Sequence, residues 1–169
     1  MPSGNALTHR YLKIALTLSV ALLALFYVAH NFANWSAAQA AIGYVFGLND
    51  HVAYPNSLAP PVTNPALIAT ALVVICAGEL AAGVVSLIGA FRLWAARKAD
   101  FAGFAAAKQM AVLGAGLAGL VWFLLFAVIG GALFQMWQTD VGASSLEGAF
   151  QFSGLALLTL IYLTQPEPD

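Results

Sequence analysis

A single carboxylic acid, Glu79, lies inside one of the most apolar stretches of this chain, ICAGELAAGV at residues 75–84. An ionisable residue inside a membrane is a functional candidate by default, because it can relay protons or hold an ion. A neutral carboxylic acid can instead donate one hydrogen bond to a neighbouring helix. The residues around Glu79 decide between these two roles.

Small residues flank Glu79 and favour the structural role. Gly78 and Gly83 lie close to it together with three alanines, and small side chains let membrane helices approach closely. We therefore predict that the carboxyl points into the protein. The expected partners carry hydroxyl groups at a similar depth: Thr17, Ser19 and Ser153. No second acid, Lys, Arg or His lies at that depth, so a proton relay lacks a partner group.

Two histidines are weak candidates for binding a cofactor. His30 lies at the end of the first apolar segment and His51 lies in the following loop. Paired imidazoles can bind haem iron, and one imidazole can bind the magnesium of a chlorophyll. Because neither histidine lies in the middle of a span, we expect no cofactor and predict hydrogen bonds that hold the loop to the helix ends. The single cysteine, Cys76, has no partner for a disulfide or a zinc site.

The composition is that of a membrane protein. Hydrophobic residues make up 62% of the chain and charged residues 8%, with a mean hydropathy of +0.86; soluble domains are about 45–50% apolar and about 25% charged. The net charge of −1 provides no basic field for nucleic acid. No phosphate-binding loop, catalytic triad or zinc-protease motif is present. We therefore predict a protein that contacts the lipid bilayer and is not an enzyme.

Four segments are long and apolar enough to cross a hydrocarbon core, which needs roughly 20 helical residues. We expect them at about 11–32, 65–94, 107–137 and 146–164, in a single domain over residues 1–169. Asn64 and Pro65 predict the start of the second span. Ser144 and Glu147 have capping-box spacing and predict the start of the fourth. The predicted fold class is an all-α bundle of four transmembrane helices.

All basic residues fall on one side of these spans. They lie before the first span or between the second and third: Arg10, Lys13, Arg92, Arg97, Lys98 and Lys108. The positive-inside rule places this side in the cytoplasm. We therefore expect a multi-pass protein of the bacterial inner membrane with cytoplasmic N- and C-termini. The final TQPEPD, residues 164–169, is expected to be a short disordered tail.

The connection between the first two spans is long enough for structure of its own. Ser36 and Gln39 have capping-box spacing, and the segment up to Gly47 is too short to span, so we expect a short interfacial helix in this periplasmic loop. Gly47 ends it, and an ordered non-helical loop follows up to residue 64. Polar and aromatic residues form an uncharged-to-acidic periplasmic rim that includes Asn31, Trp137 and Gln138.

The third span contains a packing surface. In the run GAGLAG at residues 114–119, small residues recur four positions apart, the spacing of close helix contacts in membranes. We expect Gly114 and Gly119 to pack helices together, as Gly78 and Gly83 do in the second span. The run is no dinucleotide-binding motif, because no strand precedes it.

The order of these features resembles a known family. The first span ends in His30-Asn31, the second contains Gly78-Glu79, and the third ends in GGALFQMWQ at residues 130–138. Over nearly its whole length the chain is similar to the bacterial family of predicted small integral membrane proteins, a domain of unknown function. The segment GG-x-x-F-x-M-W-Q is the most specific part of the pattern. The resemblance implies the fold and implies no reaction.

For function, we expect an accessory or assembly subunit of a larger inner-membrane complex, with other integral membrane subunits as partners. The small size, the lack of a soluble domain and the small-residue faces favour this role. A small proton-coupled carrier or channel using Glu79 is the first alternative. A pigment- or haem-associated subunit using His30 or His51 is the second.

Overall fold

A computed structural model describes residues 3–167. Within this range the helices are joined by non-helical connections, and they follow one another in the order α1 (Gly4–Ala33), α2 (Trp35–Phe46), α3 (Pro65–Ala95), α4 (Phe101–Ala107), α5 (Gln109–Leu120), η1 (Val121–Leu133), η2 (Met136–Gln138) and α6 (Asp140–Thr164). Four helices are long and apolar enough to cross a membrane: α1, α3, the run Phe101–Leu133 and α6. The predicted all-α fold with four membrane-crossing helices is confirmed.

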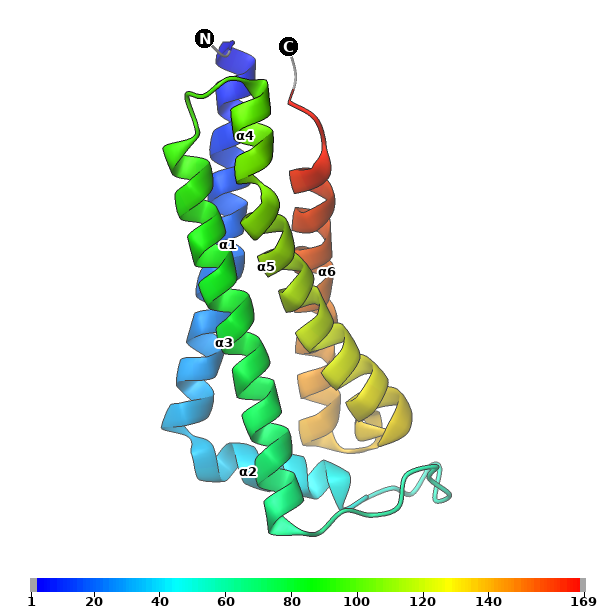
Figure 1. The fold of residues 1–169 in the computed structure, drawn as a ribbon. Helices are drawn as coiled ribbons and strands as arrows, with labels where there is room; N and C mark the ends of the chain where they lie inside the picture. Colours follow the sequence, from blue (N-terminus) through cyan, green and yellow to red (C-terminus); the bar gives the residue numbers. More distant parts are fainter. Residues whose placement is uncertain (1–2, 168–169) are drawn as a thin grey trace.

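The four long helices run side by side, and the bundle has two different ends (Figure 1). The start of α1, the turn from α3 to α4 and the end of α6 meet at one end, which we call the basic end because it carries the basic residues. The opposite end, the far end, consists of α2, the loop 47–64 and residues 134–139. In Figure 1, α2 lies crosswise below the ends of α1, η1 and α6 and beside the start of α3.

The helix α2 occupies the connection in which a short helix was predicted. It begins at Trp35, one position before the predicted cap, and no side chain caps it. It ends at Phe46, and Leu48, rather than Gly47, adopts the left-handed backbone conformation, with φ 56°. The location of α2 at a membrane interface stays a prediction.

The start of α6 corrects one prediction from the sequence. Thr139 caps this helix: its Oγ1 accepts a hydrogen bond from the Gly142 N–H at 3.0 Å. The predicted capping box at Ser144 and Glu147 is wrong, because both residues lie inside a helix that already began at Asp140. Asn64 does cap α3, accepting from the Ala66 N–H at 2.9 Å, as predicted.

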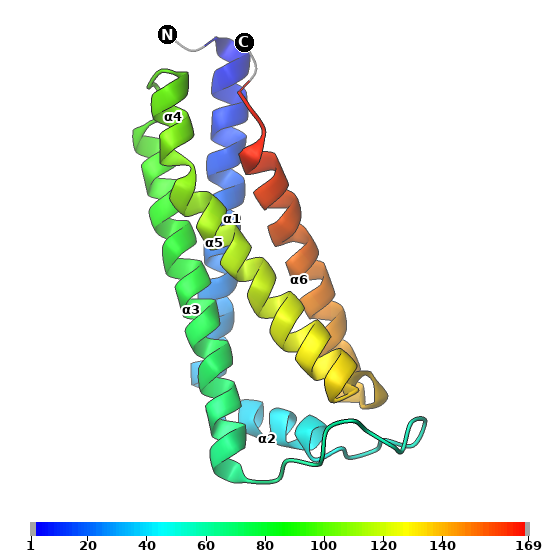
Figure 2. The ribbon, with the colours of Figure 1, turned by 45° about the vertical axis from the view of Figure 1, so that its right-hand side comes forward.

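The third span is irregular. A turn at Lys108 separates α4 from α5, and wide π-helical turns replace the α-helix from Val121 to Leu133. The span ends at Leu133, ahead of the expected residue 137, because Gln135 adopts a left-handed conformation with φ 50°. Such departures from α-geometry bend helices, and Figure 2 shows α5 and η1 crossing the bundle obliquely to meet α6 at the far end.

The core of the bundle is built mainly from small residues. The buried stripe of α3 contains Cys76, Glu79, Ala82, Gly83, Ser86, Gly89 and Ala90. The buried stripe of α5 contains Ala111, Gly114, Ala115, Ala118 and Gly119. Such residues recur three or four positions apart, so they line one helix face. Small side chains bring the helix backbones close together.

The four glycines predicted to pack helices all face a neighbouring helix. A Cβ added at any of the four would come within 3 Å of that helix. At Gly78 it would lie 2.8 Å from Val121, and at Gly83 it would lie 2.7 Å from Leu25. At Gly114 it would lie 2.6 Å from the Ser86 backbone nitrogen, and at Gly119 it would lie 2.9 Å from Leu157. These contacts join α3 to η1, α3 to α1, α5 to α3, and α5 to α6. The contact at Gly114 involves backbone, so α3 and α5 approach closely there.

We expect Gly114→Ala to lower the melting temperature in detergent. The new methyl group meets the Ser86 backbone, and such overpacking costs about 1–3 kcal/mol. That exceeds the roughly 0.5–1 kcal/mol by which alanine is favoured over glycine inside a helix. Gly154→Ala is the matched control, because nothing lies within 4 Å of its added Cβ. Equal melting temperatures for the two variants contradict the close contact of α3 with α5.

Candidate functional site

Glu79 is buried and bonded to the first span. Its side chain is 1% exposed, and its Oε2 accepts a hydrogen bond from Asn31 Nδ2 at 2.9 Å. The predicted partners Thr17, Ser19 and Ser153 are wrong, since each hydroxyl donates to a carbonyl of its own helix. Because α1 and α3 are antiparallel, the last turn of α1 lies level with Glu79 and brings an amide there.

A cavity of about 330 Å³ opens beside this pair, between α1, η1 and α6. Its aromatic walls are Tyr27, Trp122, Phe126 and Phe152, and its other lining residues are Asn31, Glu79, Ser144, Ser145, Gly148 and Ala149. The two serines are exposed, whereas Glu79 is buried. The cavity therefore leads from the surface near the far end inward to the carboxyl.

Three of the aromatic side chains hold one another in place. The ring centroids of Tyr27 and Phe152 are 4.9 Å apart, those of Trp122 and Phe152 5.6 Å, and those of Tyr27 and Trp122 6.0 Å. These separations are typical of favourable aromatic pairs. Trp122 is 2% exposed and belongs to the wide turns of η1. The aromatic walls are therefore fixed by packing.

Tyr27 and Trp122, which carry an O–H and an N–H donor, line the cavity together with acceptors that lack a partner. Within the described residues, Glu79 Oε1 and the Asn31 amide oxygen receive no hydrogen bond. The Ser145 hydroxyl donates to the Val141 carbonyl at 2.8 Å, so its lone pairs are left to accept. No Lys, Arg or His is among the described residues that line the cavity. Such a lining attracts donors and positive charge and repels anions.

His51 holds the far-end loop to the turn after η1. Its Nε2 lies 2.8 Å from the Phe134 carbonyl oxygen, and its Nδ1 lies 2.8 Å from that of Asn49. Both ring nitrogens therefore face backbone carbonyl oxygens, and the ring can donate to one of them while it is neutral. His30, in the last turn of α1, is exposed and makes no side-chain hydrogen bond to the described residues.

Trp137 and Gln138 complete the attachment of this loop. Gln138 accepts from the Tyr54 N–H at 2.8 Å and donates to the Tyr54 carbonyl at 3.3 Å, while the Trp137 ring packs edge-on against the Tyr54 ring. Phe134 stacks on Phe46, with centroids 4.1 Å apart. The segment GGALFQMWQ thus holds the loop in place. We call the loop 47–64 together with residues 134–138 the far-end platform.

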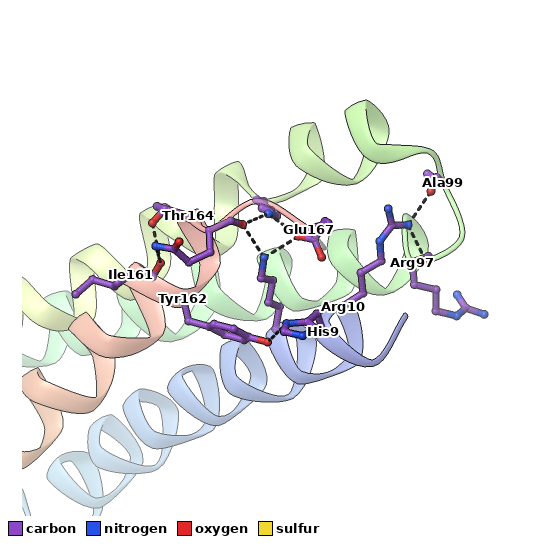
Figure 3. A network of polar contacts seen from close by, with 11 residues as sticks. His9, Arg10, Arg97, Ala99, Ile161, Tyr162, Thr164 and Glu167 are labelled. Atoms are coloured by element: carbon purple, nitrogen blue, oxygen red, sulfur yellow. Dashed lines mark hydrogen bonds and ion pairs between the residues drawn. The ribbon is translucent and has the colours of Figure 1, made fainter. Parts of the chain in front are cut away.

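An ion-pair network closes the basic end (Figure 3). Glu167 Oε1 lies 2.7 Å from Lys13 Nζ and 2.6 Å from Lys108 Nζ. Both ammonium groups also donate to the Gln165 carbonyl. The prediction of a disordered tail is therefore wrong for residues 165–167, because two buried lysines bind them; residues 168–169 lie outside the described part of the chain.

Arg10 secures the turn after α3 at the same end. Its Nη1 donates to the carbonyls of Arg97 at 3.0 Å and Ala99 at 2.7 Å (Figure 3). The guanidinium lies over the Phe104 ring, 4.4 Å from the centroid, an arrangement that attracts a cation. Buried apolar side chains fill the space beneath: Ile14, Leu93, Phe104 and Leu163. Buried side chains therefore fill the centre of this half, while an open apolar groove of about 760 Å³ lies beside it between α1 and α3.

Sequence reasoning missed Asn31 as the partner of Glu79, and it missed the aromatic walls. A usable signal exists for Asn31, since it follows Ala24 and Val28 at the three- and four-residue spacing of the buried stripe of α1. The sequence carries no signal for the aromatic walls, because Trp122 reaches α1 and α6 only through the crossing of η1 over the bundle.

The ion pairs make a pH-dependent contribution to stability. Burial raises the pKa of Glu167, but the hydrogen bonds and charges of Lys108 and Lys13 outweigh burial and hold this pKa below its ordinary value of 4.5. A carboxyl with a lowered pKa stabilises the fold fully above that ordinary value, and the contribution is lost as the pH falls through the lowered pKa.

We therefore expect Glu167→Gln to destabilise the protein at pH 7 by about 1–3 kcal/mol, because two buried ammonium groups lose their counter-ion. The difference from the unmodified protein shrinks between pH 7 and pH 3, because Glu167 gains a proton as the pH falls through its lowered pKa and both proteins then carry a neutral group. Thermal unfolding at both pH values measures this, with the exposed Glu147→Gln as control. A difference of the same size at both pH values contradicts the ion-pair network.

Comparison with known proteins agrees with this architecture. No curated protein and no solved structure matches the chain. A family model described as predicted small integral membrane protein (DUF2165) matches residues 9–166. The match begins within α1 and includes the other three long helices, Glu79 and the segment GGALFQMWQ. The chain belongs to the DUF2165 family of small integral membrane proteins.

Proposed function

We propose that this protein is a non-enzymatic accessory subunit of a larger complex in the bacterial inner membrane. The observation that carries the proposal is the far-end platform, which presents uncovered apolar side chains on an ordered loop. Val52 is 84% exposed, Leu58 89% and Tyr54 61%. The three residues fall within positions 52–58 of one loop, and contiguous exposed apolar surface marks interaction sites.

The fixed conformation of the loop 47–64 supports the proposal. Holding a non-helical segment in one conformation costs conformational entropy, about 1–2 kcal/mol per residue for the backbone. His51, Gln138 and a backbone bond from the Val62 N–H to the Phe46 carbonyl, 2.8 Å long, offset part of that cost. The four-helix core does not use Val52 or Leu58, so a partner protein at the far end accounts for their exposure.

The charge distribution supports the proposed orientation. The basic residues lie at the end that contains the start of α1 and the end of α6. By the positive-inside rule this end faces the cytoplasm, so the far-end platform faces the periplasm. A partner of the platform is then an integral membrane or periplasmic protein.

The two alternatives have less support. A carrier that uses Glu79 needs a path on both sides of the carboxyl, but the cavity reaches Glu79 from the far half, and Leu93, Phe104 and the ion-pair network fill the basic half. A pigment- or haem-associated subunit needs a free imidazole in the membrane. His51 has both nitrogens within 2.8 Å of backbone carbonyl oxygens. The His30 ring is free of hydrogen bonds to the described residues, but it lies exposed in the last turn of α1 and lines neither the cavity at Glu79 nor the apolar one beside it.

Purification from native membranes in mild detergent tests the proposal. We expect the protein to migrate with other integral membrane proteins in a particle larger than the monomer. Val52→Asp combined with Leu58→Asp is expected to reduce the co-purified partners at least tenfold, roughly 1.4 kcal/mol of binding free energy. Asn56→Asp is the control, because it adds a charge to the same loop and removes no apolar surface. A protein that runs only as a monomer contradicts the subunit role.

A further inference from the structure

The cavity at Glu79 has features that a subunit role alone does not use. A buried acid lies at its inner end, its Oε1 makes no hydrogen bond to the described residues, and its walls are aromatic. This oxygen is not among the fully buried atoms that lack a partner, so it faces the cavity. A few polar groups that converge on a largely apolar cavity are typical of a binding site.

The lining selects for a positively charged donor. Glu79 Oε1, the Asn31 amide oxygen and the serine hydroxyls can all accept hydrogen bonds from a bound group. No basic side chain among the described lining residues competes for the carboxyl. An anionic ligand would meet the carboxyl without a compensating charge, which a buried site does not tolerate.

The aromatic walls favour the same class of ligand. The rings of Tyr27, Trp122 and Phe152 surround one side of the cavity, and Trp122 is almost completely buried. Aromatic faces attract cations, most strongly when the site is desolvated, and tryptophan is the best of the three. An acid combined with such rings is the usual arrangement for recognising ammonium groups.

We propose that this cavity binds an organic ammonium group, with Glu79 as the counter-ion, Asn31 as a second acceptor and Trp122 as the principal aromatic wall. The bound pair is neutral in sum, so the charges offset each other's desolvation. The ligand enters from the far end, past Ser144 and Ser145. This proposal goes beyond the subunit role and holds whether or not a partner protein is present.

An adjacent apolar compartment has room for the uncharged part of the ligand. It measures about 90 Å³, lies between α2, α3, η1 and α6, and shares Phe126 and Ser145 with the first cavity. The ligand is thus an ammonium group attached to an apolar group. Two sources fit this chemistry: the head group of an aminophospholipid, or a soluble amine.

Fluorescence tests the soluble source. In a variant with Trp35, Trp94 and Trp137 replaced by Phe, Trp122 is the only tryptophan, and its emission is followed during titration with benzylammonium chloride. We expect a saturable change, at least tenfold weaker binding of benzyl alcohol, which has the same shape without the charge, and at least tenfold weaker binding of benzylammonium in Glu79→Gln. The exposed Glu147→Gln is the control and binds benzylammonium unchanged.

Native mass spectrometry tests the lipid source. The purified full chain is mixed with phosphatidylethanolamine or phosphatidylglycerol. We expect the protein to retain more phosphatidylethanolamine than phosphatidylglycerol. In Glu79→Gln, retention of phosphatidylethanolamine is expected to fall at least tenfold. Gly148→Leu provides a second variant, because it fills the mouth of the cavity and leaves the bond from Asn31 to Glu79 in place. It is expected to fold and to lose both kinds of binding.

The outcomes separate the two sources and can overturn the proposal. Selective binding of benzylammonium alone indicates a soluble amine, retention of phosphatidylethanolamine alone indicates the lipid, and both together establish the shared chemistry. Failure of both, equal binding of benzyl alcohol and benzylammonium, or unchanged binding in Gly148→Leu overturns the proposal. Should Glu79→Gln fail to fold, Gly148→Leu decides.

Discussion

The hydrogen bond from Asn31 to Glu79 is the interaction on which the far half of this bundle depends. A buried acid without a partner is costly, and at 2.9 Å the Asn31 amide satisfies one of its oxygens. The close approach of α1 and α3 at Gly83 and Leu25 puts the two groups level with each other. With one oxygen occupied, the carboxyl is held where its other oxygen meets the cavity, so a single contact both joins two spans and orients a candidate binding group.

The two ends of the molecule use polar residues differently. At the basic end Lys13, Lys108 and Glu167 neutralise one another and bind residues 165–167 against the bundle, which closes that half. At the far end polar side chains bind backbone instead, and they hold a loop that the core does not need. Closure on one side and an open cavity with an apolar platform on the other favour binding and docking from the far side over passage through the bundle.

The sequence allows the fold to be predicted because hydropathy, charge asymmetry and the cap at Asn64 are local signals. It places Glu79 in a helix contact but does not identify Asn31, because that pairing depends on how far α1 and α3 are shifted along each other. The sequence offers two possible caps for α6, Thr139 and the Ser144–Glu147 pair. The helix begins at the earlier one, so the prediction based on Ser144 places its start too late. The cavity could not be foreseen, because it depends on the wide turns of η1, which contain Trp122 and Phe126, and on the oblique path of this segment across the bundle (Figure 2).

A double-mutant cycle between Asn31 and Glu79 tests the central claim most directly. The free energy of unfolding is measured in detergent for Asn31→Leu, Glu79→Leu and the double variant. Each single change leaves a buried polar group unpaired, a cost of about 1–3 kcal/mol, whereas the double change leaves none. The account predicts that the double variant loses less stability than the sum of the single variants, by about 1 kcal/mol or more. Losses that add to within measurement error contradict it.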